Sequence, residues 1–195
     1  MSDHEGPDGA AIVADLNDLL QLDHDAVNAY TVAIDTLKSD DFRERLVAFR
    51  SDHKRHIEEI AALVRSRGAT PVELPHVSTG PFKLAMQAAA APGSDAVILL
   101  AFKANERQVR DKYRERSRRE YPAEVAEVLR RAAVDEDTHY MWVTHTLEAL
   151  GYGADTWTGQ VQRAIELGAR AVADAAERVE RQMVEIIERT RRELR

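Results

Sequence analysis

Two stretches of the chain carry the same order of acidic, tyrosine and histidine residues, and adding 83 to each residue number of the first gives the second. The first ends in Asp-His-x-x-His and the second in Asp-Glu-x-x-His, so each offers side chains at i and i+3 on one helical face. Such mixed carboxylate and imidazole groups suit iron, manganese or zinc. Because duplicated helical hairpins commonly build two-metal sites in bundle cores, we expect such a site here. The matched pairs are Asp23 and Glu106, Tyr30 and Tyr113, Asp52 and Asp135, His53 and Glu136, and His56 and His139.

Four predicted helices position these residues. Apolar residues recur at helical spacing around them, and the breaks fall at residues that start or stop helices. Residues 69–93 contain several prolines and predict a long connection with one short helical piece at 82–91. Two hairpins with short turns, joined by one long crossover, describe an all-α four-helix bundle. The predicted helices run from Ile12 to Lys38, from an N-cap break at Ser39-Asp40-Asp41 to a stop at Gly68, from the N-cap Ser94 to Tyr121, and from Pro122 to a stop at Gly151.

The inner stripe of each predicted helix is apolar except near its middle, where it becomes ionisable. Burying a charged carboxylate costs several kcal/mol unless a counter-charge is present. A divalent metal ion supplies that counter-charge. The alternative is an ancestral metal site that has become a polar, hydrogen-bonded core. The predicted metal ligands are Asp23, His53, His56, Glu106, Glu136 and His139.

Two further pairs of residues are placed to support these ligands. Tyr30 and Tyr113 lie two turns beyond the first acid of each repeat, on the same predicted face. There they can hydrogen-bond ligand carboxylates, and we predict them as the residues that take part in catalysis. Asp52 and Asp135 directly precede the ligand pairs and can orient a ligand imidazole through its second nitrogen.

The repeated pattern of acid-x(6)-Tyr followed by Asp-Glu-x-x-His resembles the ferritin-like superfamily that includes bacterioferritin and rubrerythrin. The resemblance covers residues 12–151 and implies a ferritin-like four-helix bundle made of two duplicated hairpins and a long crossover. It also implies two metal ions, usually iron, that react with dioxygen or hydrogen peroxide. A non-haem oxidoreductase of the ferroxidase or peroxidase type would follow. The residues that match the family's ligands without change are His56, Glu106, Glu136 and His139.

Two positions depart from the family's pattern. Asp23 stands where a glutamate is usual and is one methylene shorter. His53 stands where the first bridging glutamate is usual, and a neutral imidazole cannot bridge two metals as a carboxylate can. We therefore expect weak or asymmetric binding, with one position empty or filled by another metal. The alternative is a single-metal site formed by Glu106, Glu136, His139 and His56.

Composition limits the other chemistries. The chain has no cysteine, which excludes disulfides, iron–sulfur clusters and the rubredoxin-type module of classical rubrerythrins. Lys54 stands where bacterioferritin has its haem-ligating methionine, so we expect no haem. The net charge of −7 gives no general case for nucleic-acid binding. The sequence shows neither a signal peptide nor an apolar run of roughly 18–20 residues, so it predicts a soluble, cytoplasmic protein that does not associate with a membrane. The expected partners are metal ions and dioxygen or peroxide.

The ends of the chain have no counterpart in the repeat. Residues 1–11 predict a flexible tail before the bundle of residues 12–151. Residues 152–195 predict a long amphipathic helix whose apolar stripe alternates in steps of four and three. This helix either folds back on its own bundle or mediates homo-oligomerisation or docking to a partner. The alternative function is thus a non-enzymatic helical bundle, with a structural or lost metal, that assembles through this helix.

Overall fold

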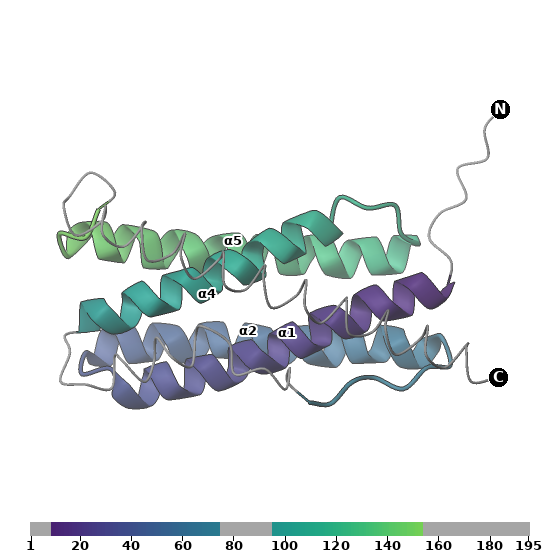
Figure 1. Ribbon diagram of the computed structural model, residues 1–195, viewed down its shortest axis with the longest axis horizontal. Helices are drawn as coiled ribbons and strands as arrows, with labels where there is room; N and C mark the ends of the chain where they lie inside the picture. Colours follow the sequence, from purple (N-terminus) through teal and green to yellow (C-terminus); the bar gives the residue numbers. More distant parts are fainter. Residues whose placement is uncertain (1–8, 75–94, 154–195) are drawn as a thin grey trace, which may run out of the picture. The chain divides into compact units, whose positions relative to one another are not determined.

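The computed structural model describes residues 9–74 and 95–153, which form four helices and, within those ranges, no strand. The predicted all-α class is therefore confirmed. The bundle belongs to the first of two units into which the chain divides, Met1–Gly151 and Tyr152–Arg195. Its helices are α1 (Gly9–Thr36), α2 (Asp40–Ser66), α4 (Asp95–Arg116) and α5 (Ala123–Ala149), as Figure 1 shows.

Local signals in the sequence set three of the eight ends of the described helices. The Ser39 side chain accepts a hydrogen bond from the backbone N–H of Phe42 at 3.4 Å and so caps α2. Both α2 and α5 end just before a glycine with positive φ, which is 72° at Gly68 and 84° at Gly151. Glycine adopts this left-handed conformation without strain. The three signals lie where the sequence predicted them.

The four helices pair as two hairpins. α1 packs along α2 and α4 packs along α5, and the hairpins meet through α1 with α4 and through α2 with α5. In Figure 1 the first hairpin is purple and blue, and the second is teal and green. This is the predicted four-helix bundle of two packed hairpins. Large apolar side chains fill its core and each contributes about 1.5–3 kcal/mol on full burial; among them are Leu16, Leu19, Leu46, Ile60, Leu99, Phe102, Leu129 and Leu147.

Polar contacts fix α4 against the first hairpin at both of its ends. At the start of α4, the Asp95 carboxylate accepts hydrogen bonds from the backbone N–H groups of Lys38 and Ser39, both at 2.9 Å. At the end of α4, Arg116 donates to Asp18 on α1 at 2.9 Å. These contacts hold the register between the hairpins, on which the alignment of the buried polar residues depends.

Several predicted segments lie outside the described residues. They include the short helical piece at 82–91 and nearly all of the predicted tail (1–11) and C-terminal helix (152–195). Within the described part, α1 begins at Gly9 instead of Ile12, and α4 ends at Arg116 instead of near Tyr121. None of the described helices combines the length and apolar character needed to cross a membrane.

Candidate metal centre

All six predicted ligands lie in the interior of the bundle with no exposed surface. Each helix contributes at least one of them, because the four-three spacing keeps them on the same inward stripe as the core leucines. They come from α1 (Asp23), α2 (His53, His56), α4 (Glu106) and α5 (Glu136, His139).

The six side chains form two overlapping groups. Asp23, His53, His56 and Glu136 each place one ligand atom within 4.8 Å of the others, and so do His53, Glu106, Glu136 and His139. His53 and Glu136 belong to both groups, and they are the matched pair at the centre of the sequence repeat. The structure therefore brings together two adjacent volumes, each surrounded by two carboxylates and two imidazoles.

Two of the histidines are oriented from the opposite hairpin. Nε2 of His56 lies 3.1 Å from Oδ2 of Asp135, and Nε2 of His139 lies 3.1 Å from Oδ2 of Asp52. A carboxylate accepts hydrogen bonds, so each Nε2 carries the proton, and the lone pair of the neutral ring is on Nδ1. The sequence predicted that these aspartates orient imidazoles, and the hydrogen bonds are present. Each aspartate serves the histidine of the other repeat.

Arg55 on α2 joins the two aspartates. It donates hydrogen bonds to Asp52 at 2.7 Å and to Asp135 at 3.0 Å. Sequence reasoning missed this residue. Its position three residues after Asp52 was a usable signal for one of the ion pairs. The second pair depends on the approach of α5 to α2, which residue spacing alone does not reveal.

Polar atoms without partners gather where a cation would lie. Within the described part of the chain, both oxygens of Glu106, both oxygens of Glu136, and Nδ1 of His56 and of His139 are buried and make no hydrogen bond. Nδ1 of His139 lies 3.7 Å from an oxygen of each glutamate, and Nδ1 of His56 lies 3.5 Å from Glu136 Oε1. Unsatisfied buried polar atoms are costly and rare in proteins. Oxygen and imidazole donors around one volume fit a divalent cation of the iron, manganese or zinc type.

The two predicted tyrosines differ in their contacts. The hydroxyl of Tyr113 donates a hydrogen bond to Oδ2 of Asp23 at 2.5 Å, as predicted for a ligand carboxylate. The hydroxyl of Tyr30 is buried and makes no hydrogen bond among the described residues, although it faces Glu106. Burial, followed by the charge of Glu106, raises the pKa of Tyr30 well above its usual value. Both tyrosines thus stay protonated at neutral pH.

The surroundings of the two glutamates shift their pKa values in opposite directions. Burial raises the pKa of Glu106 to about 7, and the charge of Glu136 adds to this effect. Burial acts in the same direction on Glu136, but the facing imidazoles, His53 above all, outweigh it and hold the pKa of Glu136 below its usual range. Glu136 is therefore the permanent anion of the pair.

The carboxylates also change the titration of the histidines. Burial alone would lower the pKa of His139, but the hydrogen bond to Asp52 and the nearby Glu136 outweigh it and raise this pKa to about 9. The same balance, with Asp135 as the main partner, raises the pKa of His56 to about 11. The positive charge of the protonated rings compensates the negative charge of the buried carboxylates. A metal ion at the site would compete with these protons for the ring nitrogens.

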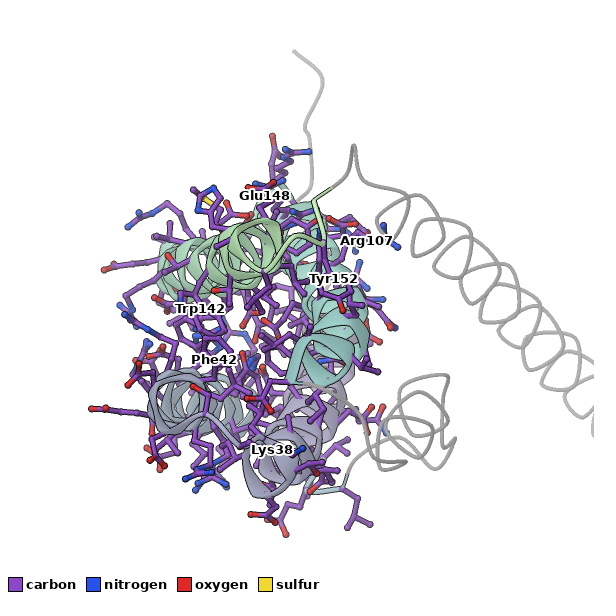
Figure 2. The ribbon with its side chains drawn as sticks, turned by 90° about the vertical axis from the view of Figure 1, so that its left-hand side faces the viewer. Lys38, Phe42, Arg107, Trp142, Glu148 and Tyr152 are labelled. Atoms are coloured by element: carbon purple, nitrogen blue, oxygen red, sulfur yellow. The ribbon has the colours of Figure 1, made fainter. Side chains whose placement is uncertain are left out.

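Aromatic rings surround one end of the site. The Tyr30 ring meets Phe102 edge-on at 4.6 Å, and Phe49 lies 4.1 Å from the His139 ring. Farther along the same helices, Phe42 on α2 faces Trp142 on α5 with ring centroids 6.0 Å apart, and the end-on view in Figure 2 shows side chains filling the space between the helices. These contacts keep the surroundings of the polar groups apolar.

Known proteins share this fold. A family model described as "Domain of unknown function (DUF2383)" matches residues 11–119. The crystal structure of a conserved hypothetical protein, rv2844, from Mycobacterium tuberculosis is 15% identical with a TM-score of 0.61, covering 72% of this chain and all of that chain. At 15% identity the similarity shows a shared fold and nothing about the site.

A second similar structure is described as that of ferritin like, diiron-carboxylate proteins from Bacillus anthracis str. Ames. It is 17% identical with a TM-score of 0.48, covering 77% of this chain and 97% of that chain. A likeness of this size supports no conclusion about the site. No curated protein matches the sequence.

Proposed function

This chain belongs to the DUF2383 family, and from that premise we propose that it binds divalent metal ions inside its four-helix bundle and works as a non-haem oxidoreductase. The metal would be iron or manganese, with zinc as the redox-inactive alternative, and the reaction would be of the ferroxidase or peroxidase type. No haem or iron–sulfur cluster takes part. The ligands would come from the six buried residues Asp23, His53, His56, Glu106, Glu136 and His139.

One observation carries the metal-binding proposal. His56 and His139 are each held through Nε2 by an aspartate, while Nδ1 of both rings lies buried near carboxylate oxygens without a hydrogen bond inside the described bundle. A core that had lost its metal and become purely polar would be expected to satisfy these atoms, because each one left unpaired costs about 1–3 kcal/mol. The arrangement is the one that metal-binding histidines use.

The residues around the site also suit redox chemistry on small oxidants. A bound iron or manganese ion would supply the electrons that reduce dioxygen or peroxide. In the metal-free site burial raises the pKa of Glu106 to about 7, so this carboxylate would give up its proton when it binds the ion. Tyr113 keeps Asp23 fixed through its short hydrogen bond. The buried setting keeps bulk water away from all of these groups.

Metal loading of the purified protein tests the binding proposal. Incubation with Fe(II) or Mn(II), followed by desalting and elemental analysis, should leave about one equivalent or more on the wild type. His139→Ala should lose it, whereas His145→Ala, which changes an exposed histidine of the same helix, should not. A ligand at 100 times its Kd stabilises the folded state by about 2.7 kcal/mol, so the wild-type melting temperature should rise on loading. Retention of less than a fraction of an equivalent, with no change in melting, would refute metal binding.

Turnover is a separate question from binding. Oxygen consumption and peroxide decay should be faster with the loaded protein than with the same concentration of free metal. If they are no faster, the enzymatic part of the proposal fails while metal binding stands. The protein would then be a bundle with a structural metal.

We also propose that the protein is a cytoplasmic homo-oligomer that assembles through residues 152–195. The support is the long amphipathic pattern of this segment in the sequence. Light scattering of the full chain and of a chain ending at Gly153 gives the test. Equal oligomeric states for both would contradict the role of the segment.

A further inference from the structure

We propose, resting on the metal binding proposed above, that the two groups of ligands are unequal and that the protein holds a single ion in one of them. The ion would be bound by the group Glu106, Glu136, His139 and His53. We assign Nε2 as the His53 donor, because Nδ1 is hydrogen-bonded to Asp23. Asp23 is not a ligand and instead orients His53. The hydrogen bonds that each residue already makes support this assignment.

Asp23 has both of its oxygens committed to protein donors. Oδ2 accepts from the Tyr113 hydroxyl at 2.5 Å, and Oδ1 lies 2.9 Å from Nδ1 of His53. Hydrogen bonds to an ionised carboxylate are among the strong ones, so giving one up to bind a metal is costly. Glu106 is the matched acid of the second repeat. The Tyr30 hydroxyl faces it, but neither Glu106 oxygen lies in hydrogen-bonding geometry with a described residue. Two residues that are equivalent in the sequence are therefore different in the structure.

The contact with Asp23 also decides which nitrogen of His53 can bind a metal. The carboxylate accepts the hydrogen bond, so Nδ1 carries the proton and Nε2 carries the lone pair. Nε2 is buried and, in the described part of the chain, has no hydrogen-bond partner. An imidazole that donates one N–H to a carboxylate and offers the other nitrogen to a metal is a recurrent arrangement at metal sites. Asp23 and His53 have this arrangement.

His53 also limits the number of ions. A carboxylate such as Glu136 has two oxygens and can contact two ions, but a neutral imidazole has one lone pair and serves one. Glu106 and Glu136 carry the two negative charges that balance one divalent ion. Removing Asp23 from the ligands leaves the other group with His56 and the shared Glu136, which is too few for a second tight site.

The repeat provides a matched pair of variants for the test. Asp23→Asn and Glu106→Gln each convert one carboxylate to an amide of the same shape, at equivalent positions. Calorimetric titration with Co(II) should give one equivalent for the wild type. Asp23→Asn should still bind one equivalent, with an affinity lower by about 10- to 100-fold, as is usual when an orienting residue is lost. Glu106→Gln should abolish tight binding and change the visible Co(II) spectrum, which reports the ligands directly.

A third variant should add a site. His53→Glu gives the first repeat the same residue that the second repeat has at position 136, and it should raise the stoichiometry from one Co(II) to two. Circular dichroism of each variant shows whether it is folded. Tyr113→Phe provides a milder change, since it removes one hydrogen bond from Asp23 and should leave one equivalent bound.

The outcomes separate this inference from the proposed function. Two equivalents on the wild type, falling to one in both amide variants, would overturn the single-ion inference and leave metal binding intact. The single-ion inference also fails, with metal binding again intact, if Asp23→Asn abolishes binding and Glu106→Gln does not. A wild type that binds no Co(II), Mn(II) or Fe(II) would overturn both. The wild-type stoichiometry alone decides between one ion and two, even if every variant fails to fold.

Discussion

His139 and Asp52 belong to different hairpins, yet Nε2 of the imidazole lies 3.1 Å from Oδ2 of the carboxylate. The contact fixes the ring so that Nδ1 is presented to Glu106 and Glu136. We predict that Asp52→Asn lowers metal affinity by about 10- to 100-fold, because the ring loses its charged partner while every ligand remains. Calorimetric titration measures this, with Asp111→Asn as the control for an aspartate paired only at the surface. Equal affinity in the two variants would show that Asp52 does not orient the ligand.

Arg55 should matter to both orienting aspartates at once. Arg55→Met removes the hydrogen bonds to Asp52 and Asp135 together, so we predict a loss of metal affinity of about tenfold or more. Arg131→Met is the matched control. Arg131 also joins α5 to α2, because it pairs with Glu59 at 2.9 Å, but its ion pairs among the described residues include neither Asp52 nor Asp135. The same titration compares them. If both variants lose affinity equally, the effect is a general loosening of the helix pair.

Metal binding should release protons. The carboxylates around His139 raise its pKa to about 9, so at pH 7 the ring is protonated and a metal must displace that proton. The affinity should therefore rise with pH, by up to tenfold per unit for each proton displaced, until the pH reaches about 9. Titrations in two buffers with different ionisation enthalpies give the number of protons released. A value of zero at pH 7 would contradict the prediction.

The protein stripped of metal should lose stability at alkaline pH. The pKa of His139 is raised from 6.5 to about 9 in the folded state, and the pKa of His56 is raised to about 11. A group whose pKa is higher in the folded state stabilises that state fully below its unfolded pKa and loses this contribution as the pH rises through the folded pKa. Urea denaturation in EDTA should thus show a stability that falls between about pH 7 and pH 11. The fall should be smaller in His139→Gln.

Asp95 should stabilise the bundle independently of the metal. Its two oxygens accept from the backbone N–H groups of Lys38 and Ser39 in the turn of the first hairpin. We predict that Asp95→Ala lowers the free energy of unfolding by about 1–2 kcal/mol, since both donors lose their partner. Asp111→Ala, which removes an exposed ion pair, should cost less than about 1 kcal/mol. Chemical denaturation of both variants checks the difference, and equal values would argue against the contact.

The sequence predicted the parts of the fold that depend on periodicity. The stripe from Phe49 through His53, His56 and Ile60 is buried throughout, because a four-three spacing keeps one face of a helix inward. The end of α4 was predicted too late. The preference of a residue before proline for extended backbone acts on Tyr121 alone, so it does not set an end at Arg116. The Tyr121 hydroxyl donates to Asp15 of α1 at 2.7 Å, a contact between distant residues that the local sequence does not reveal.

The candidate site was predictable in its residue types but not in its hydrogen bonds. Repeat spacing identified six ionisable residues, and all six are buried together. It could not distinguish Asp23 from Glu106, because the distinction rests on donors that arrive from other helices. Nor could it find the double role of Arg55, since Asp52 and Asp135 are far apart in the sequence and meet only when α5 packs on α2.

The reciprocal contacts of His56 with Asp135 and of His139 with Asp52 have a consequence for the history of the chain. The aspartates that orient His56 and His139 each come from the other hairpin, so a single hairpin would orient this histidine only by pairing with a second copy. In such a pair of identical hairpins, any substitution appears twice. Joining the two copies in one chain allows a histidine at position 53 while position 136 keeps its glutamate. Covalent fusion is thus what permits the two halves of this centre to take different tasks.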